Sequence, residues 1–321
     1  MHLGLFAFFE NPAGDTAAAL RDQLDLIRHA ETIGMREAWL SEHHFNPYSV
    51  AGPILPLMGY ALAATRTLTI GSAAVLLPYH SPIHVAEAVA ALDILSNGRV
   101  AFGIAKGAFP LDDRHFKADP HTNGTVMREA MGLIDRLLTG EAVTHKGEWY
   151  ALEEARLVPV PTRPIPRYLA TFGSEESIAY AAQNNMGLLL SQTASLETIR
   201  KAIEAYTRHT GGRKPVVNVL RMLYTESDDN AAIKGANRAA QRFASAMKGV
   251  KSGSFAPVRE EAFKALPMSD YGIVGSEARC CELLKEYKAL GVDGLMLRPA
   301  GETCEINRTM METIQHVAKG L

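Results

Sequence analysis

Apolar residues fall into two kinds of segment along the chain, short continuous runs and longer stretches with helical spacing. The short runs predict buried strands at about 2–9, 36–41, 68–76, 99–105, 167–171, 186–190, 215–224 and 292–298. The longer stretches repeat apolar residues every three or four positions, which predicts helices at 16–33, 82–95, 121–139, 174–184, 195–210, 228–248, 276–290 and 302–318. Strand and helix therefore alternate from one end of the chain to the other.

This alternation predicts an α/β fold with a parallel sheet, because each connection between strands is long enough to hold a helix. Eight strand–helix pairs close a (β/α)8 TIM barrel, a fold of about 250 residues that tolerates insertions. The 321 residues are therefore expected to form a single barrel domain over 1–321. A doubly wound open sheet is the rival arrangement, but no Gly-x-Gly-x-x-Gly motif follows a predicted strand.

Two insertions interrupt the alternation. Residues 141–166 contain Trp149, Tyr150 and a series of prolines, which predicts a hairpin and an extended connector before the fifth strand. Residues 249–274 contain glycine and proline among polar residues. Loops that follow strands build the active site of barrel enzymes, so this second insertion is a candidate lid.

The composition narrows the class of protein. Hydrophobic residues make up 47% of the chain and charged residues 21%, which is enough for a sizeable core. The net charge is −2 without a dense basic stripe, so nucleic acid is not an expected partner. The apolar N-terminus lacks a basic leader and is too short to span a membrane, so we expect a buried strand. Cys280, Cys281 and Cys304 form no Cys-x-x-Cys pair, which suits a reducing cytoplasm.

The end of the second predicted strand carries Glu42, His43 and His44. Barrel enzymes place their chemistry at such strand ends, and an imidazole can exchange a proton at neutral pH. A metal site would use the same residue types, but adjacent side chains on a strand point to opposite faces, so at most one imidazole enters the barrel mouth. His80 and His84 flank a proline and are expected at a solvated helix start, and no metal is expected.

Three other strand ends carry candidate ligand-binding features. Small residues at 71–74 would let a flat ligand approach the backbone, although close packing of strand on helix is the simpler explanation. Lys106 suits an anionic group, or it is an exposed loop lysine. Gly173 and Ser174 precede a predicted helix, whose free N–H groups and positive dipole end can cradle a phosphate. Two carboxylates for a glycosidase, Glu42 and Glu226, qualify by position only.

These segments together resemble the bacterial luciferase-like monooxygenases, and especially the catalytic α subunit of luciferase. The resemblance runs nearly end to end and is strongest from 36 to 190. It is carried by Trp39-Leu40-Ser41-Glu42-His43-His44-Phe45, Gly71-Ser72-Ala73-Ala74-Val75-Leu76-Leu77-Pro78, Leu92-Asp93-Ile94-Leu95-Ser96-Asn97-Gly98-Arg99, Phe102-Gly103-Ile104-Ala105 and Gly173-Ser174. Several fragments in the right order are more specific than any one of them.

The resemblance implies a monooxygenase that takes reduced FMN from a separate NAD(P)H:flavin reductase. A C4a-(hydro)peroxyflavin formed with O2 would oxygenate a small organic substrate, with His43 as the catalytic general base. The expected flavin-binding residues include a pair joined by a cis peptide bond and two serines at the phosphate; they are Phe6, Glu42, Ala73, Ala74, Ala105, Lys106, Thr171, Gly173, Ser174 and Ser177. The substrate space would be bordered by His44, Phe109, Phe172 and the 249–274 insertion.

Three positions depart from the luciferase pattern. Where luciferase has an arginine that binds the phosphate, this chain has a residue near Gly124. The reactive cysteine of luciferase and the arginine next to it are replaced by Ala105 and Lys106, and an aromatic residue near the flavin is replaced by Gln192. The flavin affinity and light emission of luciferase therefore do not carry over. The alternatives are an F420-dependent hydride-transfer enzyme of the same family, a non-catalytic flavin-binding partner subunit, and an unrelated barrel hydrolase. A homodimer is expected, since family members commonly dimerise.

Overall fold

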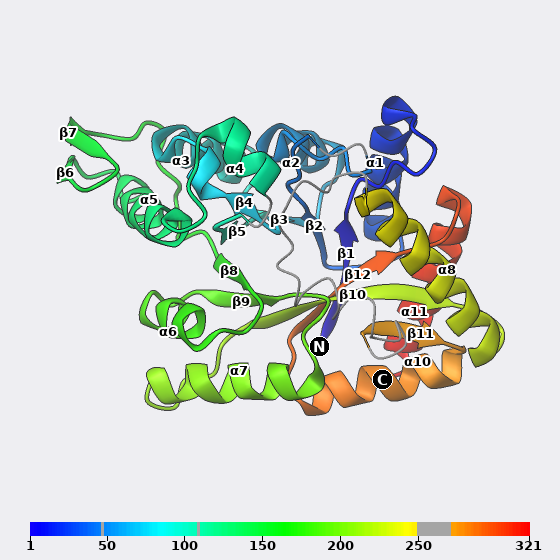
Figure 1. The fold of residues 1–321 in the computed structure, drawn as a ribbon. Coiled ribbons are helices and arrows are strands. Elements are labelled where there is room, and N and C mark those ends of the chain that lie inside the picture. Colours follow the sequence, from blue (N-terminus) through cyan, green and yellow to red (C-terminus); the bar gives the residue numbers. More distant parts are fainter. Residues whose placement is uncertain (46–47, 108–109, 249–270) are drawn as a thin grey trace.

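Parallel strands close into a barrel in the computed structural model, which describes residues 1–45, 48–107, 110–248 and 271–321 (Figure 1). Consecutive barrel strands pair with one another, and the last pairs with the first. The barrel strands are β1 (His2–Ala7), β2 (Glu37–Leu40), β3 (Thr69–Ser72), β5 (Val100–Ala105), β8 (Arg167–Thr171), β9 (Gly187–Leu190), β10 (Val217–Thr225) and β12 (Gly294–Pro299). The predicted (β/α)8 barrel is confirmed.

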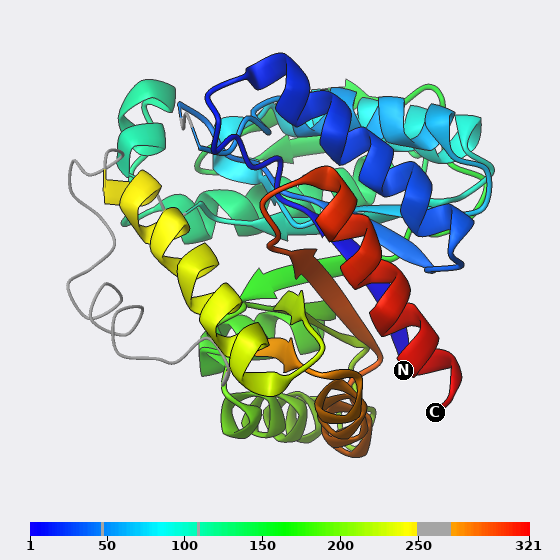
Figure 2. The same cartoon turned by 90° about the vertical axis from the view of Figure 1, so that its right-hand side faces the viewer.

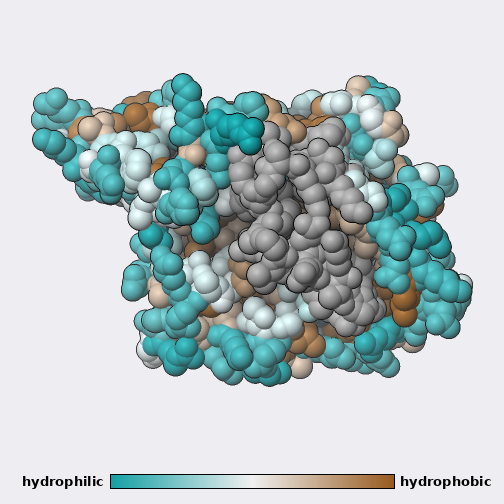
Figure 3. Space-filling view, in the orientation of Figure 1, coloured by the Kyte–Doolittle hydropathy of each residue, from teal (hydrophilic) through white to brown (hydrophobic). Residues whose placement is uncertain are grey.

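Helices surround the barrel and pack one apolar face against it. They are α1 (Thr16–Thr32), α2 (Ile54–Ala64), α3 (Pro82–Leu95), α4 (Pro110–Phe116), α5 (Asn123–Leu137), α6 (Glu175–Gln183), α7 (Leu196–His209), α8 (Asp229–Lys248), α10 (Glu277–Ala289) and α11 (Cys304–Lys319). In α7, Ile199, Ala202 and Tyr206 recur at helical spacing and are buried. Figure 3 shows mainly hydrophilic side chains along the lower edge of the molecule, over α7 and α10.

Two helices were not among those expected from the sequence. The first, α2, is apolar on most of its surface, so its sequence has no clear helical period to detect. The second, α4, is a short helix that follows β5. Helix α2 is the crossover that joins β2 to β3, whereas α4 lengthens the connection between β5 and α5.

The third predicted strand is interrupted. β3 ends at Ser72, the peptide bond between Ala73 and Ala74 is cis, and β4 (Val75–Leu76) then pairs with β5. A 3-10 turn at Leu77–Tyr79 follows directly and leads into α3. The cis bond expected from the resemblance is confirmed.

The two predicted insertions have different outcomes. The first contains the expected hairpin, β6 (Val143–Lys146) with β7 (Ala151–Ala155), which projects from the body at the upper left of Figures 1 and 3. The second was placed at 249–274, but β11 (Gly272–Gly275) forms a parallel ladder with the end of β10, so the predicted boundary is wrong. A four-residue strand of small and apolar residues has too little alternation to be recognised. Residues 249–270 lie outside the described residues.

The barrel interior is filled by side chains, as is usual for this fold. Phe6, Trp39, Ala101, Leu189 and Met296 form its buried cluster. A Cβ at position 71 would lie 2.3 Å from the Trp39 ring, so that strand position accepts only glycine beside the indole. A larger cluster fills the layer between strands and helices.

The two termini lie side by side, with the start of β1 close to the end of α11 (Figure 2). Strand β1 pairs with β2 on one side and with β12 on the other, and this last pairing closes the barrel. No helix in the part of the chain that the structure describes is long and apolar enough to cross a membrane.

Candidate functional site

A buried carboxylate stands at the carboxyl end of β2. The Glu42 side chain is 0% exposed, and its Oε1 accepts hydrogen bonds from His44 Nε2 at 2.7 Å and His80 Nε2 at 2.6 Å. Its Oε2 accepts from the Leu76 N–H at 2.9 Å. Burial alone would raise the pKa of the Glu42 carboxyl, but these hydrogen bonds outweigh burial and lower the pKa. Glu42 is therefore a fixed negative charge at neutral pH.

The expected position of His80 at a solvated helix start is wrong. His80 follows the 3-10 turn, which folds the chain back so that the imidazole reaches Glu42, and its side chain is only 25% exposed. His84, one turn further along α3, is exposed as expected. The spacing of the two histidines gave no sign of this contact, because the contact depends on the path of β3 and β4.

The two adjacent histidines after Glu42 have different surroundings. His44 packs edge-on against Phe116, with ring centroids 4.7 Å apart. The His43 ring instead lies 4.8 Å from the Phe8 ring at the end of β1. Burial lowers the pKa of the His43 imidazole to about 4, and the charge of Glu42 only partly offsets this. His43 is therefore neutral at pH 7, which is the form that accepts a proton.

Small residues line the barrel mouth beside this histidine pair. Ala73 is partly exposed and packs against the interior cluster that contains Phe6. The Ala73 N–H donates to the Leu40 carbonyl at 2.7 Å, which ties the cis segment to the end of β2. Ser72 Oγ bridges to the Gly103 backbone at 2.8 and 2.9 Å, which ties it to β5. The backbone around Ala73 and Ala74 is therefore held on both sides.

The start of α6 has the arrangement that was predicted for an anion site. Ser174 caps the helix by accepting from the Ser177 N–H at 3.4 Å, and its hydroxyl lies 2.8 Å from Ser177 Oγ. Gly173 has a φ of +97° and donates its N–H to Thr171 Oγ1 at 3.0 Å. The two hydroxyls thus stand together at the positive end of the α6 dipole.

An arginine missed by the sequence analysis stands beside this helix start. Arg128 on α5 pairs with Glu176 in the first turn of α6, with Nη1 to Oε1 at 2.8 Å. A Cβ at Gly124 would lie 3.8 Å from both terminal nitrogens of Arg128. A cation thus stands near Gly124, although its side chain comes from one turn later on the same helix. The i,i+4 spacing within the predicted helix could have indicated this.

Aromatic rings and a buried ion pair form a further wall near His43, which the sequence analysis did not predict. Arg298 at the end of β12 is 5% exposed and pairs with the Glu10 carboxylate. Its guanidinium lies 5.5 Å from the Phe8 centroid and 5.3 Å from the Phe243 centroid. Tyr48 donates its hydroxyl to Glu10 at 2.8 Å. The wall therefore presents aromatic rings, and the positive charge of Arg298 is neutralised by Glu10.

The remaining predicted residues are spread around the barrel mouth. Ala105 ends β5, and both Lys106 and Phe172 are exposed. Gln192, in the loop after β9, has its carbonyl held by the buried Arg221 at 3.1 Å. Phe109 lies outside the described residues.

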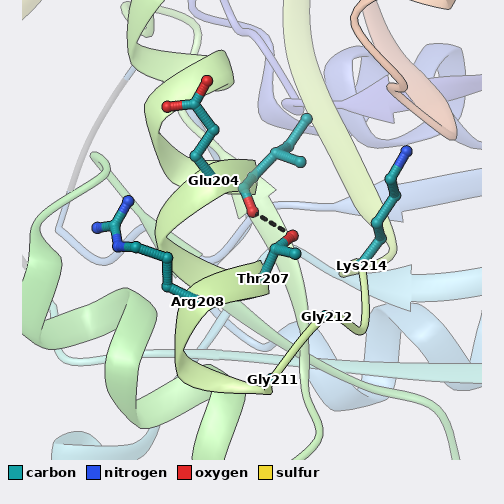
Figure 4. A pocket seen from close by; sticks show the side chains of 7 residues that line it. Glu204, Thr207, Arg208, Gly211, Gly212 and Lys214 are labelled. Atoms are coloured by element: carbon teal, nitrogen blue, oxygen red, sulfur yellow. Dashed lines mark hydrogen bonds between the residues drawn. The ribbon is translucent and has the colours of Figure 1, made fainter.

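An open surface cavity of about 620 Å³ lies away from these groups, between the end of α7 and the start of β10. Its side chains do not converge on a common point: Glu204, Arg208 and Lys214 point in different directions (Figure 4). It lies at the amino-terminal end of the strands, where barrel enzymes do not place their chemistry. We therefore assign no role to it.

Comparisons with known proteins agree with the resemblance seen in the sequence. A family model described as luciferase-like monooxygenase matches residues 1–294. The oxygenase component of a flavin-dependent trigonelline monooxygenase from Acinetobacter baylyi is 26% identical over 319 residues, covering 91% of this chain and 87% of the relative. Limonene 1,2-monooxygenase from Rhodococcus erythropolis is 33% identical over 175 residues, 54% of this chain but only 45% of the relative.

Solved structures show the same fold at low sequence identity. The oxygenating constituent of 3,6-diketocamphane monooxygenase from Pseudomonas putida, in complex with FMN, has a TM-score of 0.82 and 17% identity, covering 98% of this chain and 97% of that one. An F420-dependent secondary alcohol dehydrogenase has a TM-score of 0.78 and 19% identity, with coverage of 98% and 97%. The fold is therefore shared by proteins that use different cofactors.

Proposed function

This chain belongs to the luciferase-like monooxygenase family, and we propose that it is the oxygenase of a two-component system that uses reduced FMN and O2 to oxygenate a small organic substrate. A separate NAD(P)H:flavin reductase would supply the flavin, as the words "oxygenase component" imply for the trigonelline relative. The observation that supports the proposal best is the neutral imidazole of His43 shortly after β2, the strand whose Leu40 carbonyl also holds the cis segment at Ala73 and Ala74.

The residues present fit the phosphate end of FMN. The Ser174 and Ser177 hydroxyls and the free N–H groups of the first turn of α6 offer hydrogen bonds to an anion. Arg128 adds a cation within reach of that turn. The two acids there are already paired, Glu175 with His209 and Glu176 with Arg128, so their repulsion of a phosphate is reduced.

The barrel mouth fits the flat ring system of the flavin. Ala73 and Ala74 present methyl groups only, so a planar ring can approach the backbone there. Phe6 closes the barrel interior below them. Lys106 is exposed directly after β5 and is suited to a polar edge or a phosphate.

When bound, reduced FMN would supply the electrons that activate O2. The neutral imidazole of His43 would accept a proton from flavin N5 or from the substrate and return it. Phe8, Tyr48 and Phe243 would keep water from the reacting atoms, since this wall exposes little polar surface. His44 and Phe172 would border the substrate together with this wall.

The second candidate is hydride transfer with F420, which is supported by the F420-dependent alcohol dehydrogenase of the same fold. Two measurements separate the candidates. Titration of the purified protein with FMN and with F420 should show tighter binding of FMN, and reduced FMN should cause oxygen uptake that yields an oxygenated product. Preferred binding of F420, or turnover without oxygen, would replace the first proposal with the second.

A homodimer is also proposed, because α2 and α3 expose apolar side chains to solvent. Tyr60 is 55% exposed and Leu95 is 82% exposed, and Ile83 and Ile94 lie on the same helix pair. Both helices are apolar around most of their surface, a pattern typical of helices covered on two sides. The barrel covers one side, and a second copy would cover the other.

A further inference from the structure

Glu42, His44 and His80 bring one carboxylate and two imidazoles together, and the proposed reaction gives this combination no role. One buried carboxylate oxygen accepts from two imidazoles, and the three potential ligand atoms lie within 4.8 Å of one another. Imidazole and carboxylate are among the commonest ligands of divalent transition metals. No metal is expected from the sequence, in part because His80 is expected in solvent, but His80 instead lies 2.6 Å from Glu42.

The separations of the three ligand atoms are compatible with a tetrahedral site. Ligand bonds of about 2.0–2.1 Å place neighbouring ligand atoms about 3.3 Å apart. Glu42 Oε1 now lies 2.7 and 2.6 Å from the two imidazole nitrogens, so each separation must open by less than about 1 Å to admit the ion. Glu42 Oε2 is already held by the Leu76 N–H, which orients the carboxylate as an outer hydrogen bond does in metal sites.

The electrostatics around the cluster favour a cation. Glu42, Asp112 and Asp113 are all buried, and in the described part of the chain none of them pairs with lysine or arginine. Tyr79 and Asn123 donate to Asp113, which leaves its charge uncompensated. Asp112 interacts electrostatically with both Glu42 and His44, so the three carboxylates act on the same region.

Asp112 supplies an independent sign of a missing partner. Its side chain is 1% exposed, and Oδ2 has no hydrogen-bond partner among the described residues. A buried carboxylate oxygen normally has one, because an unpaired polar atom costs free energy. Burial raises the pKa of Asp112 to about 6, and the neighbouring charges of Asp113 and Glu42 add to this, whereas His44 only partly offsets it. A divalent ion near His44 would supply a compensating positive charge.

We propose that Glu42, His44 and His80 form a binding site for a divalent transition-metal ion such as Zn²⁺, adjacent to His43. Each imidazole now directs Nε2 at Glu42, so the bound form would carry its proton on Nδ1 and leave Nε2 for the metal. The fourth position would hold water or a substrate atom. Metal binding would immobilise His44 and replace the hydrogen bonds from the two imidazoles to Glu42 Oε1, so the ion would act on the proposed active site as a regulator or as a ligand for substrate.

The test uses the full-length protein, freed of metal by a chelator and kept without flavin. Titration with Co²⁺ is followed through its visible absorption, which is strong for a four-coordinate site, and Zn²⁺ is then added to displace it. We expect one equivalent of Co²⁺ per chain and loss of the bands with Zn²⁺. His44→Gln and His80→Gln should each weaken Co²⁺ binding by about a hundredfold, since each removes one of three ligands.

His84→Gln is the matched control, because His84 is an exposed imidazole on α3 one turn from His80. It should bind Co²⁺ like the wild type. Circular dichroism checks the fold of each variant, and Glu42→Gln gives a third ligand variant if one of the others unfolds. Absence of a one-to-one Co²⁺ complex in the wild type, or equal affinity in folded His80→Gln and wild type, would overturn the proposal. Because flavin is absent, either result leaves the FMN proposal unchanged.

Discussion

Glu42 Oε1 and His80 Nε2 lie 2.6 Å apart, although 38 positions separate the two residues in the chain. The contact joins the end of β2 to the entrance of α3, around the cis segment at Ala73 and Ala74. It holds the carboxylate of Glu42, the residue before His43, and ties the 3-10 turn at Leu77–Tyr79 to the end of β2. The arrangement of the site therefore depends on His80, a histidine that is far in the sequence from the Glu-His-His segment but in contact with its glutamate.

The first prediction concerns His43. His43→Ala should retain FMN affinity but lose coupled product formation by about 10²–10⁴-fold, because the variant has no group to exchange the proton. Oxygen uptake should continue and yield hydrogen peroxide, which an electrode and a peroxidase assay measure together. Coupled oxygenation at the wild-type rate in the variant would remove His43 from the chemistry.

The second prediction concerns Arg128. Arg128→Ala should weaken FMN binding by about 10–100-fold, since a charge-assisted hydrogen bond contributes about 1.5–3 kcal/mol. Riboflavin has no phosphate, so its affinity should not change. Arg28→Ala is the control, because Arg28 is an exposed arginine paired with Asp25 on α1, a helix that packs against α2 and α11 and not against α6. Equal losses for FMN and riboflavin would show that Arg128 acts through the fold instead.

The third prediction separates capping from phosphate binding at Ser174. Ser174→Ala should lower the free energy of unfolding by about 1 kcal/mol through loss of the helix cap, and it should also weaken FMN binding. Thr303 caps α11 in the same way, accepting from the Ile306 N–H at 3.2 Å, on a helix that does not pack against α6. Thr303→Ala should therefore show a similar loss of stability, measured by denaturant titration, with unchanged FMN affinity. A matching drop in FMN affinity for both variants would argue against phosphate at Ser174.

The fourth prediction concerns pH and Glu31. Its Oε1 accepts from the N–H groups of Arg66, Thr67 and Leu68 at 2.8, 2.6 and 3.0 Å. Burial would raise the pKa of Glu31, but these bonds outweigh it and lower the pKa.

A carboxyl with a lowered pKa stabilises the fold above its unfolded-state value, and this contribution is lost as the pH falls through the folded-state pKa. Glu31→Gln should therefore destabilise the protein at pH 7, and the difference from wild type should shrink below about pH 4. Thermal unfolding across this range measures it. A difference that stays constant with pH would contradict this account of Glu31.

The fifth prediction concerns the apolar surface of α2 and α3. Leu95→Lys should shift a homodimer to monomers, because it places a charge in an apolar contact. Light scattering after gel filtration measures the mass. Phe172→Lys, a change at another exposed hydrophobic residue, should leave the mass unchanged. A wild-type protein that is monomeric at all concentrations would end the dimer proposal.

Much of the barrel could be predicted from the sequence, because each element satisfies its own local pattern. Strand β8 at Arg167–Thr171 and helix α3 at Pro82–Leu95 have the predicted bounds, since turn residues end them sharply. Helix α2 and strand β11 were missed because neither has a detectable period. The strand-end position made His43 a candidate, and the resemblance also located the cis bond at Ala73, which local pattern alone does not indicate.

Only the tertiary structure decided which side chains meet. The sequence determined that Glu42, His43 and His44 end a strand, but not that His80 completes the cluster or that Arg128 stands at the start of α6. Nor did it reveal Arg298 enclosed by Phe8 and Phe243. The physical reason is that a strand or helix is set by neighbours along the chain, whereas closing a barrel brings together loops from distant strands, and their contacts depend on where every strand ends.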